Sequence, residues 1–394
     1  MILKVFNDDG TTNEHKIEKE LFYDEKLEEK ISYISSSNKE ENALKIFQSY
    51  FSNAKSILFD NTNKAIVKQL EELNIKEFRE KDFSFIYFTS GTTGFPVGAL
   101  KTNENILEEI KVLSRLFKKY AVKRVIVTVP FIHFYGSLMG LMYPLFNDID
   151  IILKEHFLPS DLLDLIDDNS LVITTPLYIK SLNRVNEVKD LSKSIFLSST
   201  APLMPNIAKE FNEKFSSNII QLFGSTETGG ISYKYNDESL WTPLEKVETF
   251  VNELNELKVK SPFISNILFE KTFKTTNSEI QTFDYVEFED SRFKLVGRSS
   301  QILKVAGKRY STIQIEHILE DIKDIRKAVV FVNSNKDALR GESLEITIES
   351  DKEFLVKDIK QILKKELSNI KFSITLKIVD KIKTTAIGKK IAIE

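Results

Sequence analysis

Residues 84–101 read SFIYFTSGTTGFPVGALK, and this stretch decides how the rest of the chain is interpreted. Its apolar start, residues 84–88, is typical of a buried strand, and the strand leads directly into a loop of Gly, Ser and Thr. Glycines let a backbone approach a ligand closely, and successive N–H groups in such a loop can hold an anion. The G-x-x-x-x-G-K-[ST] pattern of P-loop NTPases is absent. We therefore expect a phosphate-binding loop of another kind.

Strands alternate with helices around this loop, which predicts a largely parallel, layered α/β sheet. The helical segment 103–120 is amphipathic, with apolar residues at helical spacing. After about residue 250 short alternating runs predict an antiparallel appendage, and the last 90 or so residues read as a compact α+β unit. We predict a large N-terminal layered α/β domain, residues 1–298, and a small C-terminal domain, residues 299–394. The strands of the layered domain are predicted at 124–129, 150–153, 171–176, 194–199 and 218–224.

Composition and charge narrow the classes of function. The chain has 394 residues, no cysteine and a net charge of −3, which excludes disulfides and thiolate metal sites and argues against a dedicated nucleic-acid binder. Residues 125–147 carry no formal charge, but Pro130, Gly136 and Gly140 interrupt them. We interpret this window as a buried strand, a turn and a buried helix, not as a membrane span. The N-terminus lacks a signal-peptide pattern, and we expect a cytoplasmic protein with no membrane partner.

The stretch 88–106, FTSGTTGFPVGALKTNENI, resembles the phosphate-loop motif of the adenylate-forming enzymes, which include acyl- and aryl-CoA synthetases, peptide-synthetase adenylation domains and luciferases. The family pattern is TSGTTG-x-P-K-G followed by T-H-x-N. Here Val97 takes the place of the lysine and Asn103 that of the histidine. The resemblance implies that this loop holds the β- and γ-phosphates of ATP. The residues to which it assigns this role are Thr89, Ser90, Gly91, Thr92, Thr93 and Gly94.

Further segments resemble the family's other motifs in the same order. VPFIHFYG, residues 129–136, places His133 where members border the carboxylate of the acid; the alternative is a structural histidine at a strand end. QLFGSTETGG, residues 221–230, resembles Y-G-x-T-E and makes Glu227 the candidate Mg²⁺ ligand, since Mg²⁺ prefers hard oxygens together with substrate phosphates. LSSTAPL, residues 197–203, resembles the segment beside the adenine. The nucleotide-binding residues implied by the last two segments are Thr200, Ala201, Pro202, Phe223, Gly224 and Thr226.

The C-terminal third resembles the closing motifs of the family. Asp284 takes the place of the aspartate that binds the ribose hydroxyls, although Phe283 replaces the glycine before it, and Arg298 takes the place of the motif arginine. Ser300 stands where members have the first hinge acid, and the resemblance implies that the small domain is a mobile lid. Lys389, in the pattern T-x-x-G-K, would be the catalytic lysine; the alternative is one more cation in a lysine-rich tail.

The resemblance implies a two-step reaction. ATP and a small carboxylic acid give acyl-AMP and pyrophosphate with Mg²⁺, and a phosphopantetheine thiol of CoA or an acyl carrier protein then displaces AMP. Amino-acid activators carry an aspartate near position 133, so His133 favours an aryl or a short-to-medium acyl acid. Two alternatives stay open: transfer to a non-thiol acceptor, and a nucleotide-binding scaffold without activity. Fewer residues precede the phosphate loop than in usual members, which implies a reduced N-terminal subdomain. The sequence leaves the oligomeric state unknown.

Overall fold

The computed structural model describes residues 1–35, 38–89, 96–298, 302–305, 308–334, 342–367 and 373–383. The chain forms two compact units, Met1–Thr249 with Val259–Ile280, and Phe250–Lys258 with Gln281–Glu394. The boundaries between the units fall within β14 (Glu248–Val251), β15 (Glu256–Lys260) and β18 (Glu279–Glu289). The division predicted at 298/299 stays a prediction, and its hinge residue Ser300 lies outside the described residues.

The first unit contains a long mixed sheet with parallel strands at its centre. Its strands are β1 (Ile2–Phe6), β2 (Thr12–Lys16), β7 (Arg124–Val127), β8 (Asp150–Lys154), β9 (Ser170–Thr174), β10 (Ile195–Ser198), β11 (Asn218–Ser225), β12 (Gly229–Tyr235) and β13 (Thr242–Pro243). They run in the order β13-β12-β11-β10-β9-β7-β8-β1-β2. The strands from β11 to β1 are parallel, and β2, β12 and β13 are antiparallel additions at the edges. Parallel strands are covered on both faces, which accounts for their continuous apolar runs.

A second sheet carries residues 84–101. Its strands are β3 (Ile31–Ser35), β4 (Lys55–Phe59), β5 (Phe85–Thr89), β6 (Val97–Lys101), β16 (Ile267–Phe269) and β17 (Phe273–Thr275), in the order β17-β16-β6-β5-β4-β3. Strands β5 and β6 are antiparallel partners on either side of the glycine loop, with Thr89 opposite Val97. The side chain that replaces the family lysine is thus buried in a strand, since Val97 is only 8% exposed.

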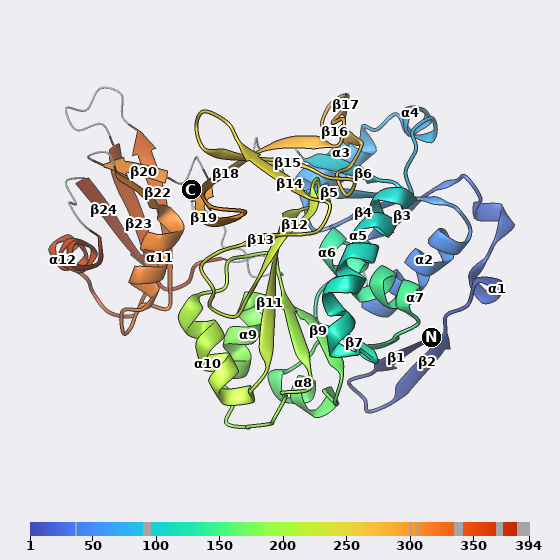
Figure 1. The fold of residues 1–394 in the computed structure, drawn as a ribbon, viewed down its shortest axis with the longest axis horizontal. Coiled ribbons are helices and arrows are strands. Elements are labelled where there is room, and N and C mark those ends of the chain that lie inside the picture. The colour runs from blue at the N-terminus through green and yellow to red at the C-terminus, as the bar shows by residue number, and fades with distance from the viewer. Residues whose placement is uncertain are drawn as a thin grey trace. The chain divides into compact units, whose positions relative to one another are not determined.

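Helices cover the two sheets in layers, as Figure 1 shows for the first unit. A central layer lies between the sheets: Tyr87 of β5 points toward it and donates or accepts a 2.6 Å hydrogen bond with Ser137 of α6. The next residue toward the N-terminus, Ile86, points to the opposite face and packs with Ile66 of α3 and Phe78 of α4. The central layer contains α2 (Lys39–Phe51), α5 (Asn103–Phe117), α6 (Phe134–Ser137), a π-helix (Leu138–Met142) and α7 (Tyr143–Asn147). The outer layers contain α3 (Lys64–Glu71) and α4 (Ile75–Arg79) on the second sheet, and α8 (Pro159–Leu165), α9 (Pro176–Asn183) and α10 (Pro205–Phe215) on the first.

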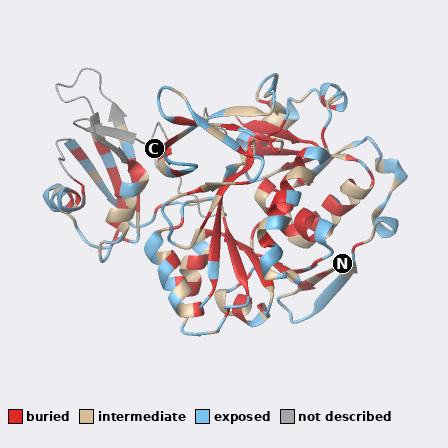
Figure 2. Ribbon diagram, viewed as in Figure 1, coloured by how far each residue is buried: buried red, intermediate tan, exposed pale blue. Residues whose placement is uncertain are grey.

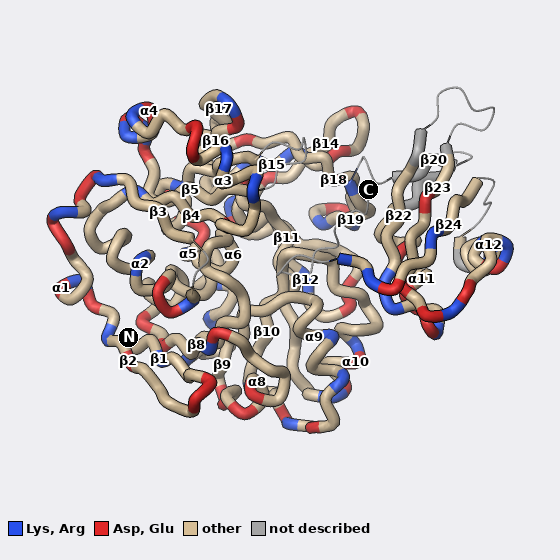
Figure 3. Tube along the Cα trace, turned by 180° about the vertical axis from the view of Figure 1, so that it is seen from behind, with Lys and Arg blue, Asp and Glu red and all other residues tan. Residues whose placement is uncertain are grey.

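The core follows this layering, and the charges stay mostly outside it. Figure 2 shows the central strands and the inward sides of the helices as buried. Figure 3 shows basic and acidic residues interspersed along outer helices such as α4 and α10. The uncharged window 125–147 forms β7, a turn, and the buried run from α6 to α7, as predicted. Within the described part of the chain, no helix has both the length and the apolar character needed to cross a bilayer.

The second unit is a smaller α+β structure. Strands β18 and β19 (Arg292–Arg298) pair antiparallel, in line with the predicted appendage. Strands β22 and β23 pair antiparallel and β23 and β24 pair parallel, with helices packed on them around a core that includes Leu319, Ile346 and Leu363. The predicted fold class, a layered α/β domain with a smaller α+β domain, is confirmed. The remaining elements are β20 (Ile302–Val305), β21 (Lys308–Ser311), α11 (Thr312–Glu320), β22 (Lys327–Ser334), β23 (Glu342–Glu349), α12 (Val356–Glu366) and β24 (Ser373–Val379).

Candidate active site

Three of the predicted motif segments lie at the carboxyl ends of parallel strands of the first sheet, β7, β10 and β11, with β9 between β7 and β10. Open α/β sheets bind ligands at this edge. The register aligns Val127 with Ile173, and Ser198 with both Thr174 and Gln221, so β7, β9 and β10 end near one level while β11 continues to Ser225. The Tyr135 hydroxyl donates to the Leu197 carbonyl at 2.7 Å. The fold therefore brings the segments predicted to contact the acid and the adenine to one edge.

The predicted adenine segment contains a strained residue. Thr200 has a φ of 79°, and a β-branched residue is a genuine outlier in the left-handed region. Such conformations cost about 1–3 kcal/mol and cluster at ligand sites. Its neighbour Ser199 is held by a 2.8 Å hydrogen bond from its hydroxyl to the Leu222 carbonyl. On the adjacent strand, the Phe223 ring lies 5.5 Å from the ring of Trp241, an aromatic pair that sequence reasoning did not identify.

The predicted phosphate loop and the predicted Mg²⁺ ligand meet in the first unit. The hydroxyl of Thr89, at the end of β5, donates to Glu227 Oε1 at 3.1 Å. Glu227 lies in the turn between β11 and β12, where the Ser225 N–H donates to the Thr228 hydroxyl at 3.0 Å. The backbone N–H of Ser265 donates to the Glu227 carbonyl at 2.9 Å. Two motifs more than 130 residues apart in the sequence thus converge, as their assigned roles require.

The donor atoms at this point fit a magnesium ion. Glu227 offers a carboxylate and Thr89 a hydroxyl, and both are hard oxygen ligands. Among the described residues no group of three or more His, Cys, Asp or Glu side chains is arranged to hold a metal. Mg²⁺ is commonly bound by one or two carboxylates together with substrate phosphates and water, and does not need such a group. The site therefore suits a cation that arrives with a nucleotide.

A buried lysine and a buried glutamate lie directly behind Glu227, and sequence reasoning missed both. Lys101, at the end of β6, is fully buried; its ammonium donates to the Phe263 carbonyl at 2.7 Å and to the Glu227 carbonyl at 3.4 Å. Glu109, on α5, is 1% exposed and accepts the Gly230 N–H at 2.7 Å. Burial lowers the pKa of Lys101 while Glu109 and Glu227 oppose the shift. Burial raises the pKa of Glu109 while Lys101 and the Gly230 N–H oppose it.

The sequence does contain a signal for this pair. Glu109 interrupts the apolar stripe of α5, lying on the face that carries Ile106, Ile110 and Leu113, all of which are buried. Lys101 ends an otherwise apolar strand whose five residues are all buried. Charged side chains on faces that pattern assigns to the core are rarely buried unless paired.

The helix that carries Glu109 begins in the segment that replaces the family's T-H-x-N. Thr102 and Asn105 form a capping box: the Thr102 hydroxyl accepts the Asn105 N–H, and the Asn105 side chain accepts the Thr102 N–H. Asn103, in the place of the histidine, is exposed and accepts a 3.0 Å hydrogen bond from the Tyr50 hydroxyl. The threonine and second asparagine of this motif therefore act in starting the helix.

His133 lies at the start of α6, after the turn that follows β7. Burial lowers its pKa, and Asp60 opposes the shift. Two aromatic residues that the sequence places near it, Phe131 and Phe134, are buried in the core.

The second unit contains the two residues predicted to contact the ribose. Asp284 and Arg298 are opposite each other on β18 and β19, with Arg298 Nε 3.6 Å from Asp284 Oδ1. Burial raises the pKa of Asp284, and Arg298 opposes the shift. Of the other predicted residues, Ala201 and Pro202 follow β10, Gly224 lies in β11, and Thr226 lies in the turn after it. Seven predicted residues lie outside the described residues: Ser90, Gly91, Thr92, Thr93, Gly94, Ser300 and Lys389.

Comparisons with known proteins give sequence relatives and solved structures of similar fold. A probable CoA ligase, CCL5, from Humulus lupulus is 26% identical over 316 residues, which cover 69% of this chain and 57% of that protein. ATP-bound MatB from Rhodopseudomonas palustris has a similar fold, with a TM-score of 0.81, 14% identity and coverage of 99% of this chain and 94% of MatB. O-succinylbenzoate coenzyme A synthetase (MenE) from Bacillus subtilis, in complex with ATP and a magnesium ion, has a TM-score of 0.79, 16% identity and coverage of 98% and 95%.

A family model described as AMP-binding enzyme matches residues 5–262, which is more than half of the chain. The match covers the phosphate loop, His133, the adenine segment and Glu227. The chain belongs to the AMP-binding enzyme family.

Proposed function

We propose that the protein activates a carboxylic acid with ATP, forming acyl-AMP and pyrophosphate, and then transfers the acyl group to a phosphopantetheine thiol of CoA or an acyl carrier protein. The observation that carries the proposal is the contact between Thr89, which begins the phosphate loop, and Glu227. This contact joins the predicted phosphate loop to the predicted Mg²⁺ ligand in a chain of the AMP-binding enzyme family. The name of the relative, a probable CoA ligase, and that of MenE, a coenzyme A synthetase, support the same chemistry.

In the first step a carboxylate oxygen attacks the α-phosphorus of ATP, and the bond from that phosphorus to the bridging oxygen breaks as pyrophosphate leaves. The chain's task is to bring two anions together and to stabilise the charge that develops on pyrophosphate. Thr89 and the loop residues up to Gly94 hold the β- and γ-phosphates. Glu227, with the Thr89 hydroxyl, would hold Mg²⁺, and the ion would offset phosphate charge. Lys389 bridges the carboxylate and the α-phosphate as a compact cation.

In the second step the thiolate attacks the acyl carbon, the acyl–phosphate bond breaks, and AMP leaves with the electron pair. Asp284 and Arg298 bind the ribose in this proposal, while Thr200, Ala201 and Pro202 flank the adenine together with Phe223, Gly224 and Thr226. The segment around Ser300 acts as the hinge that moves Lys389 away between the two steps. Movement of this kind is a conformational step of the lid type.

The acid is proposed to be an aryl or a short-to-medium acyl acid. A histidine at position 133, at the start of α6, does not offer the fixed negative charge that an α-ammonium group needs. Position 133 therefore favours a substrate whose recognised part, apart from its carboxylate, is uncharged.

The test is exchange of labelled pyrophosphate into ATP in the presence of a panel of aryl and acyl acids, followed by measurement of AMP release with CoA or a phosphopantetheine-bearing carrier protein. We expect exchange with at least one acid and thiol-dependent AMP release. Glu227→Gln and Lys389→Ala should each slow exchange by about 10²-fold or more, as loss of preorganised electrostatic groups does.

Glu213→Gln is the matched control, because Glu213 is exposed on α10 and pairs only loosely with Lys209, at 3.9 Å. It should leave exchange unchanged. Absence of exchange with every acid would contradict the proposal and favour a nucleotide-binding scaffold. Exchange without thiol-dependent AMP release would instead indicate a non-thiol acceptor, such as an amine or a hydroxyl.

A further inference from the structure

We propose that Lys101 is a positioning residue for the Glu227 carboxylate, acting through the backbone of the turn that carries it, and that Glu109 holds the other end of the same turn. This inference rests on the proposed role of Glu227 as the Mg²⁺ ligand. It assigns a role to two buried charges that the proposed chemistry does not otherwise use.

The Lys101 ammonium contacts two backbone carbonyls, one of them that of Glu227. It lies 3.4 Å from the Glu227 carbonyl and 2.7 Å from the Phe263 carbonyl, and 4.6 Å from the centre of the Phe134 ring. The Glu227 carbonyl also accepts the Ser265 N–H at 2.9 Å. Two donors from separate segments thus fix the peptide group of Glu227, and the Thr89 hydroxyl fixes its carboxylate.

The far end of the turn contacts Glu109. Glu109 Oε1 accepts the Gly230 N–H at 2.7 Å, three residues beyond Glu227. A Cβ on Gly229 would lie 2.5 Å from Glu109 Oε2, so the carboxylate packs directly against this glycine. The turn is therefore held by a cation at Glu227 and by an anion at Gly230.

Lys101 and Glu109 are both buried, which is an unfavourable setting for charged groups. Burying an ionised group is costly unless it is well paired and hydrogen-bonded. Yet Glu109 Oε2 has no hydrogen-bond partner among the described residues. An apolar pair of similar volume would fill this space at lower cost. The presence of Lys101 and Glu109 in place of an apolar pair indicates that their hydrogen bonds with the turn have a role. Because the turn carries Glu227, that role is to orient the Glu227 carboxylate.

The experiment compares ATP binding with Mg²⁺ and ATP binding in EDTA, measured by calorimetry on the full chain. Lys101→Met alone leaves Glu109 uncompensated and risks misfolding, so the test variant is Lys101→Met with Glu109→Gln. This double variant removes both charges, and the amide oxygen introduced by Glu109→Gln keeps an acceptor for the Gly230 N–H. We expect Mg²⁺-dependent affinity to fall by about 10- to 100-fold, as loss of outer-shell partners of a metal ligand does, while affinity in EDTA stays the same.

Two controls make the result specific. Lys214→Met removes another lysine that donates to backbone carbonyls, those of Leu182 and Asn183, and lies over a Phe ring, but on α10, away from the Glu227 turn. This variant should bind ATP as the unmodified protein does, both with Mg²⁺ and in EDTA. Glu227→Gln should lose the Mg²⁺-dependent gain in affinity altogether.

The possible results separate the two proposals. If the unmodified protein binds ATP no better with Mg²⁺ than in EDTA, the proposed role of Glu227 is wrong. If Mg²⁺ raises the ATP affinity of the unmodified protein and raises that of the double variant equally, the positioning role of Lys101 is wrong. If the double variant loses affinity equally in both conditions, the pair supports folding only, and the positioning role is again overturned.

Discussion

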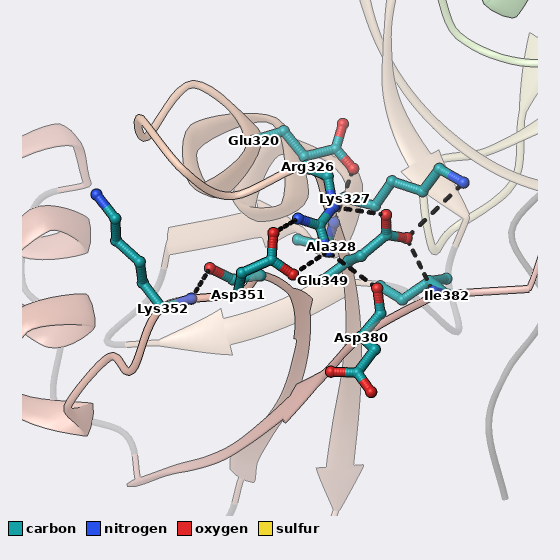
Figure 4. A network of polar contacts seen from close by, with 10 residues as sticks. Glu320, Arg326, Lys327, Ala328, Glu349, Asp351, Lys352, Asp380 and Ile382 are labelled. Carbon is teal, nitrogen blue, oxygen red and sulfur yellow. Dashed lines mark hydrogen bonds and ion pairs between the residues drawn. The ribbon is translucent and has the colours of Figure 1, made fainter.

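Two buried glutamates in this chain have opposite surroundings. Glu109, in the first unit, is 1% exposed, and one of its carboxylate oxygens has no hydrogen-bond partner among the described residues. Glu349, in the second unit, is 7% exposed, and both of its oxygens have partners (Figure 4). Arg326 Nε lies 3.0 Å from one oxygen, and the Ile382 N–H donates to the other at 2.8 Å. Arg326 also contacts Asp351 and is itself exposed.

The difference shows in the pKa of each carboxyl group. Burial raises the pKa of Glu109, because the opposing effects of Lys101 and the Gly230 N–H are too small to offset it. Burial also acts to raise the pKa of Glu349, but the Ile382 N–H and Arg326 together outweigh it, and the pKa is lowered. A well-partnered glutamate at the rim of a domain supports its fold. A glutamate with an incomplete set of partners inside the core needs another reason to be there, which the turn of Glu227 supplies.

The largest expected effect on stability comes from replacing the basic residue near each glutamate, Lys101 near Glu109 or Arg326 near Glu349. Lys101→Met breaks a fully buried charge interaction and should lower the free energy of unfolding of the first unit by about 3–5 kcal/mol. Arg326→Met should lower the stability of the second unit by less, because the guanidinium is exposed and Glu349 keeps the Ile382 N–H and Lys327 as partners.

Urea unfolding can separate the two units. The one tryptophan in the sequence, Trp241, belongs to the first unit and reports on it by fluorescence, while circular dichroism follows the whole chain. Equal decreases in the free energy of unfolding for Lys101→Met and Arg326→Met would contradict the expected difference between the buried and the exposed cation.

A second, smaller effect tests how closely Glu109 packs against the turn. Gly229 has a φ of 70°, and a Cβ there would also lie 2.8 Å from Phe263 Cβ, besides its contact with Glu109. Gly10 has a φ of 83° and nothing within 4 Å of an added Cβ. Gly10→Ala should therefore cost only the left-handed conformation, about 1–2 kcal/mol, and Gly229→Ala about 1–3 kcal/mol more from overpacking. Thermal unfolding of both variants measures the difference. Similar decreases in melting temperature would show that the Glu109 carboxylate moves aside at little cost.

The sequence predicts the fold better than it predicts this packing. The strands from β7 to β11 were predicted because parallel strands are apolar throughout and end in recognisable motifs. The N-terminal strands β1, β2 and β3 were missed, since β2 is mostly exposed and β3 partly so, which leaves no strong apolar run. The division into two sheets was also not predicted, because the register between distant strands is a tertiary property.

In the candidate site, too, motifs predict single residues, whereas the contacts between them depend on the fold. Thr89 and Glu227 were assigned separately by their motifs, and only the fold brings their side chains to 3.1 Å. Val97 was noted as the loss of a cation, whereas its burial opposite Thr89 depends on strand pairing. Lys101 and Glu109 belong to no motif, and their partners are backbone atoms of residues 263, 227 and 230, which a sequence pattern does not reveal.

The smallest expected effect is a difference in pH dependence, and its sign separates the two glutamates. Glu109 has a raised pKa, so the folded state binds more protons than the unfolded chain above pH 4.5; its contribution to stability is present below 4.5 and is lost as pH rises. Glu349 has a lowered pKa, so its contribution is present above 4.5 and is lost as pH falls. Relative to the unmodified protein, Glu109→Gln should therefore remove a decline in stability toward neutral pH, and Glu349→Gln should remove a decline toward acid pH. Urea unfolding between pH 4 and pH 8 measures both, and slopes of the same sign would show that the two carboxyl groups have similar environments after all.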